Sequence, residues 1–101
     1  MLTQFDVHEL AARPPISHCI ILNGAHDSEL ETLLVMPLIA HDPADFALPI
    51  YIQLDVQGQT LTTRPDLIAS VPRSVIGKRI MSHEDKRFEI LGVVDRLLAG
   101  Y

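Results

Sequence analysis

Cys19 is the only cysteine in this chain of 101 residues, so no disulfide can form within it. Aromatic residues make up 5% of the chain, and no run of basic residues is interleaved with them, which argues against direct reading of nucleic-acid bases. No apolar run approaches the length that crosses a bilayer. The chain does not start with a basic segment followed by an apolar core and a cleavage site, so we expect a soluble protein of the reducing cytoplasm.

The motifs of common catalytic and metal sites are also missing. The five histidines lie far apart, without an H-x-x-x-H spacing, and neither G-x-S-x-G nor a glycine-rich phosphate loop occurs. Cys19 lies in an apolar stretch, where a cysteine usually behaves as a small hydrophobic residue. Asp42 and Asp45 form a carboxylate pair, but a capped turn beginning at Asp42-Pro43 explains them more simply. We therefore expect no metal, no cofactor and no enzymatic activity.

Charge is unevenly distributed along the chain. The net charge is −5, yet residues 1–63 contain a single basic residue, Arg13, while the other seven basic residues lie in residues 64–101. This asymmetry fits one face that repels nucleic acid and another that meets an acidic protein partner, although solvated surfaces give the same pattern. Apolar residues make up 48% of the chain, which fits either a dimer that buries further surface or a tightly packed monomer.

Alternating apolar residues and turn residues predict strands at residues 4–10, 16–22, 32–39, 49–56 and 59–64, with a further extended stretch at 67–71. Asn23-Gly24 and Gln57-Gly58 are turn signals. Residues 32–39 are apolar apart from Thr32, which indicates burial on both faces or one face against a partner. Residues 25–31 and 41–48 read as connections. The pattern predicts one mainly β domain over residues 1–101, a small barrel or sandwich.

One helix is predicted at residues 82–98. Ser82 and Asp85 fit a capping box at its start. Gly92 costs about 1 kcal/mol relative to alanine in a helix interior, which indicates close approach of another backbone or neutral drift. The apolar side spans too wide an arc for one core, so Leu97 or Leu98 is expected to meet a partner chain; its members are Ile90, Val93, Val94, Leu97 and Leu98.

The segment A-S-V-P-R-S-V-I-G at residues 69–77, followed by a helix and a glycine-containing tail, resembles the CcdB family of toxins. Further matches occur in order along the chain, at Gln4-Phe5-x-Val7, Val35-Met36-Pro37-Leu38, Gln57-Gly58, Thr62-Thr63, Ser82-His83 and Gly100. The resemblance implies an SH3-like barrel with an additional small antiparallel sheet and a C-terminal α-helix, assembled as a symmetric homodimer. The expected dimer-interface residues are Ser70, Val71, Leu97 and Leu98.

The resemblance also implies a function. Members of the family bind the A subunit of DNA gyrase and trap the cleaved DNA complex, without catalysis of their own. A CcdA-like antitoxin neutralises the toxin through a disordered acidic segment, and the two together repress their operon, with the antitoxin contacting the operator DNA. Carried over to this chain, the gyrase-binding residues are Phe88, Leu91, Gly92, Asp95, Ala99, Gly100 and Tyr101.

Two of these positions depart from the family pattern. Ala99 stands where the family has a tryptophan that stacks on the target, and Asp95 replaces a neutral amide. Tyr101 could restore some stacking, while Phe88 and Leu91 fit either a binding face or the core. Two alternatives follow: a CcdB-like protein with a weakened or changed target, or a ribonuclease toxin of related fold. The second would use Arg64 with Thr62 and Thr63, or Arg73 with Ser74.

Overall fold

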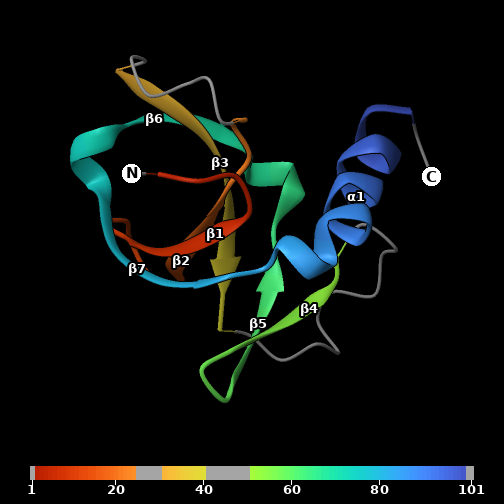
Figure 1. Cartoon of the computed structure of the whole chain (residues 1–101), viewed down its shortest axis with the longest axis horizontal. Helices are drawn as coiled ribbons and strands as arrows, with labels where there is room; N and C mark the ends of the chain where they lie inside the picture. The colour runs from red at the N-terminus through yellow and green to blue at the C-terminus, as the bar shows by residue number, and fades with distance from the viewer. Residues whose placement is uncertain (1, 25–30, 41–50, 100–101) are drawn as a thin grey trace.

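The computed structural model describes residues 2–24, 31–40 and 51–99, which form a strongly curled sheet with one helix beside it (Figure 1). The strands are β1 (Asp6–Leu10), β2 (Ile16–Ile21), β3 (Thr32–Ile39), β4 (Gln53–Val56), β5 (Gln59–Thr63), β6 (Ala69–Pro72) and β7 (Ile76–Ser82). The helix is α1 (Arg87–Ala99), and 3₁₀ turns lie at η2 (Pro65–Leu67), η3 (Arg73–Val75) and η4 (Glu84–Lys86). The predicted mainly β fold with a C-terminal helix is confirmed.

Strand β3 is at the centre of the sheet, whose order is β4-β5-β3-β2-β1-β7 with every pairing antiparallel. One edge of β3 pairs with β2, and the other edge pairs with β6 at its start and with β5 at its end. The β4–β5 hairpin corresponds to the additional small sheet and is continuous with the barrel strands, since β5 pairs with the end of β3 at Leu38 and Ile39. Gln57 and Gly58 both have positive φ, as a two-residue hairpin turn requires.

Both faces of the sheet are buried. Successive side chains of a strand point to opposite sides, so each of these strands contributes to two apolar clusters. One face packs under α1 and the β4–β5 hairpin, around Phe5, Ile20 and Met36. The other face fills the inside of the curl, around Cys19, Ile21 and Val35. The prediction that β3 is buried on both faces holds from Val35 to Ile39, whereas the Leu34 side chain is 42% exposed.

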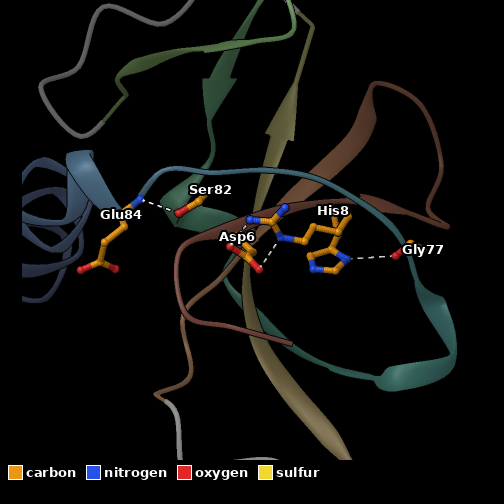
Figure 2. Close-up of polar contacts among 6 residues, drawn as sticks. Asp6, His8, Gly77, Ser82 and Glu84 are labelled. Carbon is orange, nitrogen blue, oxygen red and sulfur yellow. Dashed lines mark hydrogen bonds and ion pairs between the residues drawn. The ribbon is translucent and has the colours of Figure 1, made fainter. Parts of the chain in front are cut away.

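The start of the helix differs from the predicted capping box. The backbone N–H of Glu84 donates to the Ser82 hydroxyl at 3.1 Å, so serine does satisfy an early donor (Figure 2). The chain then forms the η4 turn, and the α-helix begins only at Arg87. The Asp85 carboxylate lies 3.8 Å from Nδ1 of His83. The other nitrogen of that ring, Nε2, donates to the backbone oxygen of Asp55 at 2.9 Å, which joins the start of the helix to β4.

Strand β7 was not predicted, since the predicted extended stretch ends at residue 71 and Pro72 and Gly77, which often interrupt strands, follow it. The strand pairs with β1 through two register shifts, and such bulges break the alternation that identifies a strand. Gly77 is no turn residue. A Cβ atom there would lie 3.3 Å from both the Cβ and the backbone oxygen of Glu9, so glycine permits β1 to lie close. The predicted turn at Asp42-Pro43 lies outside the described residues.

Candidate functional site

The side of α1 that points away from the barrel carries most of the predicted binding residues. At about 100° per residue they fall within roughly a third of the helix circumference, and we call them the outer face: Phe88, Leu91, Gly92, Asp95 and Ala99. Phe88 is 83% exposed and Leu98 is 80% exposed, while Leu91 is 40% exposed. Ile90 and Val93, on the opposite side, are fully buried. Gly100 and Tyr101 lie outside the described residues.

An exposed phenylalanine is unusual enough to call for an explanation, since burying such a ring is worth about 1.5–3 kcal/mol. The sequence left open whether Phe88 and Leu91 belong to the core or to a binding face, and the structure places neither in the core. Phe88 and Leu91, three residues apart, form the apolar stripe of the outer face. Large apolar groups in such a stripe are typical of surfaces that meet another macromolecule.

A hollow of about 410 Å³ lies beside this stripe, lined by Ile52, Phe88, Glu89, Gly92 and Arg96. Gly92 forms part of its wall, and a Cβ atom added there would meet no atom within 4 Å in the described part of the chain. The close backbone approach that the sequence suggested at Gly92 is therefore not found within these residues. The missing side chain instead leaves the hollow wider.

Arg87 links the outer face to the core. Its Nη1 donates to Oε1 of Glu84 at 2.8 Å. Its guanidinium carbon lies 5.5 Å from the centre of the buried Phe5 ring and 5.9 Å from the centre of the exposed Phe88 ring. Both distances are within the range of a cation–π contact. Phe5 itself has a φ of 67°, a conformation that costs a bulky residue of order 1–3 kcal/mol.

The predicted dimer residues form two separate groups in the protomer. Leu97 and Leu98 lie at the C-terminal end of α1, where Leu97 is half-buried and Leu98 exposed. Ser70 and Val71 lie on β6, which Figure 1 shows curling along the barrel away from that end of the helix. The Ser70 hydroxyl donates to the hydroxyl of Thr32 at 3.1 Å, and Ser70 is paired with the exposed Leu34.

The residues suggested for a ribonuclease are mostly engaged in the fold. Thr62 and Thr63 are buried, and the backbone N–H of Ile52 donates to the Thr63 hydroxyl at 3.1 Å. Arg64 forms a two-pronged ion pair with Asp66, with donor–acceptor distances of 2.8 and 2.6 Å. These hydrogen bonds lower the pKa of Asp66 and raise the pKa of Arg64. The guanidinium is therefore already matched by a carboxylate.

The buried polar groups serve the sheet. Burial raises the pKa of the Cys19 thiol to about 12. His8 donates from Nδ1 to the backbone oxygen of Gly77 at 2.9 Å, and the buried Asp6 accepts from Nε of Arg79 at 2.9 Å (Figure 2). The Asp6 hydrogen bond raises the pKa of Arg79. Across the described residues, no three His, Cys, Asp or Glu side chains are grouped as a metal site would require, and no helix is long and apolar enough to cross a membrane.

A comparison with protein families decides the relationship, because the model of the CcdB protein family matches residues 4–100. The chain belongs to the CcdB family. No curated protein matches it. Among solved structures, it is similar to an endoribonuclease in complex with its cognate antitoxin from Mycobacterial species, with a TM-score of 0.79, 10% identity, and coverage of 96% of this chain and 94% of that one. A second endoribonuclease from Mycobacterial species gives a TM-score of 0.76, 11% identity, and coverage of 96% and 90%.

The outer face of α1 holds the described residues that the resemblance to the CcdB family implied as gyrase-binding. The sequence did not indicate the residues that contact this face or hold Arg87 beside it, namely Ile52, Glu84 and Arg87 itself. The spacing of Glu84 and Arg87, three residues apart, is a sequence signal for an ion pair on a helical turn. The contacts of Arg87 with Phe5 and of the hollow with Ile52 join distant segments, which a local pattern does not show.

Proposed function

We propose that this CcdB-family chain is the toxin of a toxin–antitoxin pair, and that it acts in the cytoplasm by binding the A subunit of DNA gyrase and trapping the cleaved DNA complex. The observation that carries the proposal is the apolar stripe of Phe88 and Leu91 on the outer face of α1. Trapping needs only tighter binding to the open, cleaved state of the enzyme than to its other states. No catalytic group on the toxin is required.

The departures at Ala99 and Asp95 shift the expected contact along the helix. Ala99 offers no ring at the C-terminal end of the outer face, whereas Phe88 offers one at the N-terminal end. Aromatic anchors commonly supply several kcal/mol of an interface. A changed target, the alternative raised by Ala99, predicts that cells tolerate overproduction of the chain. Gain of toxicity in Ala99→Trp would then identify the lost anchor.

The proposal includes a homodimer and an antitoxin. Leu98 on α1, and Leu34 beside Ser70 on the sheet, are exposed apolar side chains that a second copy would cover. A CcdA-like antitoxin with an acidic segment would neutralise the toxin and supply the operator DNA contacts of the complex. One of the two similar structures was determined with its cognate antitoxin, which supports a partner of this kind.

The second candidate is a ribonuclease toxin, favoured by the endoribonucleases of similar fold. The residues available for it give less support, because Arg64 is paired with Asp66 and the neighbouring threonines are buried. Arg73 and Ser74 lie at η3, and the Arg73 backbone N–H donates to Glu31.

Two assays on the same purified protein separate these functions. With gyrase, ATP and supercoiled plasmid, wild type is expected to give linear DNA after detergent, and Phe88→Ala to lose that product. With a defined RNA, wild type is expected to leave the substrate intact. Arg64→Ala serves as the matched control, since it should retain trapping of DNA. Absence of linear DNA at micromolar protein refutes the gyrase proposal, and RNA cleavage that Arg64→Ala abolishes establishes the second candidate.

A further inference from the structure

We propose that Phe88 is the anchor of the docking face and that Arg87 is a positioning residue that fixes its ring before the partner arrives. The inference rests on the proposed function for the identity of the partner, the A subunit of gyrase. Its structural half concerns the free protein alone. It moves the centre of the contact from the C-terminal end of α1 to the first turn of the helix.

The first argument is the chain of contacts that leads from the core to Phe88. The buried Phe5 ring lies below the Arg87 guanidinium, and the exposed Phe88 ring is the next group along. Glu84 holds the guanidinium from the side at 2.8 Å. Glu84 is itself fixed, since its backbone N–H donates to the Ser82 hydroxyl at the end of β7. The exposed Phe88 ring is thus connected to the barrel through Arg87, which also contacts Phe5 and Glu84.

The second argument is the backbone at Phe5. A φ of 67° is strained for a phenylalanine, and the strain is maintained by two backbone hydrogen bonds, from Phe5 N–H to Ile21 and from His83 N–H to Phe5. In this conformation the Phe5 ring is fully buried and still meets Arg87. The barrel therefore provides a rigid aromatic base for the arginine.

The third argument is what a fixed ring gains in binding. A phenylalanine that moves freely in the unbound protein loses that freedom when it is captured, and ordering it beforehand removes the loss. A planar guanidinium stacks on a ring, whereas the ammonium of lysine is a compact point charge on a flexible stem. Lysine at position 87 would keep the ion pair with Glu84 and a weaker cation–π contact, without the planar guanidinium that meets both rings.

The adjacent Lys86 gives a matched control. Lys86 also carries a positive charge and also pairs with a glutamate three residues away, with Nζ 3.6 Å from Oε1 of Glu89. Arg87→Met and Lys86→Met each remove one charge and one ion pair from the same turn. Arg87 alone of the two meets the Phe88 ring in the structure.

The test uses the full chain with Phe88→Trp, which introduces the sole tryptophan, because the sequence has none. Fluorescence anisotropy decay then reports the motion of the ring in the free protein. Arg87→Met in this background is expected to add a fast component, Arg87→Lys to give an intermediate one, and Lys86→Met to leave the decay unchanged. Glu84→Gln provides a second route to the same loosening if Arg87→Met fails to fold. Equal decays in the Arg87→Met and Lys86→Met backgrounds overturn the positioning role.

Binding to the gyrase A subunit tests the anchor. With phenylalanine at position 88, Phe88→Ala is expected to weaken binding at least about tenfold, Arg87→Met about threefold to tenfold, and Lys86→Met less than about twofold. Wild-type binding that Phe88→Ala leaves unchanged overturns the anchor and leaves the proposed function standing. Failure of the wild type to bind refutes the proposed function, and the anisotropy still decides whether Arg87 orders residue 88.

Discussion

Replacing Gly92 with alanine tests whether the backbone of another segment packs closely against the middle of α1. Gly92 is an interior residue of α1, and an added Cβ would meet no atom within 4 Å among the described residues. Glycine in a helix interior costs about 0.8–1.0 kcal/mol relative to alanine, chiefly because its backbone loses more freedom on folding. With nothing to displace, Gly92→Ala should recover most of that amount.

The expected gain is therefore about 0.8 kcal/mol in the free energy of unfolding. For a domain of this size it corresponds to a rise in Tm of roughly 3–6 °C. Urea titration followed by circular dichroism should show a higher midpoint with an unchanged slope, since the surface exposed on unfolding stays the same. Gly77→Ala is the control of opposite sign, because its Cβ would lie 3.3 Å from the backbone oxygen of Glu9.

One result would refute this reasoning. If Gly92→Ala lowers the Tm, and lowers it more at high protein concentration than at low, a neighbouring chain packs its backbone against Gly92 in solution. The same substitution also narrows the hollow beside Phe88. A variant that is more stable and yet binds gyrase less well would show that the hollow receives a group of the target.

Four further predictions concern the core and the dimer. Because burial raises the pKa of Cys19 to about 12, above its ordinary 9.0, the thiol stays protonated in the folded protein. Iodoacetamide at pH 8 should label it only in guanidinium, and the free energy of unfolding should fall as pH rises from about 9 towards 12, less so in Cys19→Val. Rapid labelling of the folded protein would contradict the burial. Ile90→Ala should cost about 2–5 kcal/mol in urea unfolding, because it empties a fully buried position, whereas Leu98→Ala should change stability by less than about 0.5 kcal/mol per protomer apart from any effect on association. Equal losses would show that α1 packs differently. Sedimentation should detect a dimer that Leu98→Asp dissociates, and an unchanged mass would remove Leu98 from the interface. Thr62→Val should raise stability by about 1 kcal/mol, because the buried hydroxyl has no hydrogen-bond partner in the described part of the chain; a loss of stability would reveal a partner.

Local patterns identified the elements that are specified by residues adjacent in the sequence. The Gln57-Gly58 turn and the apolar run of β3 were predicted correctly, because each depends on residues that are neighbours in sequence. Strand β7 escaped prediction because its bulged pairing with β1 disturbs the alternation and Gly77 resembles a turn signal. Gly77 allows β7 to lie close to β1, which is far away in the sequence.

The sequence also predicted only part of the candidate site, because some of its contacts join distant segments. Periodicity placed Ile90 and Val93 on the apolar side of α1, where the structure buries them, but it left open whether Phe88 and Leu91 belong to the core or to a binding face. That choice depends on how the helix is attached, through the hydrogen bond of His83 to Asp55 and the contact of Arg87 with Phe5. Both contacts join segments that only the folded chain brings together.

The outer face of α1 and the buried side with Ile90 and Val93 lie opposite each other on a single helix. If the outer side is the recognition surface proposed above, substitutions there change the target while the buried residues that hold the helix on the barrel stay the same. A change of binding target would then need few mutations on the outer side and few others to restore stability. Toxins of this fold could therefore keep one scaffold while they bind different targets.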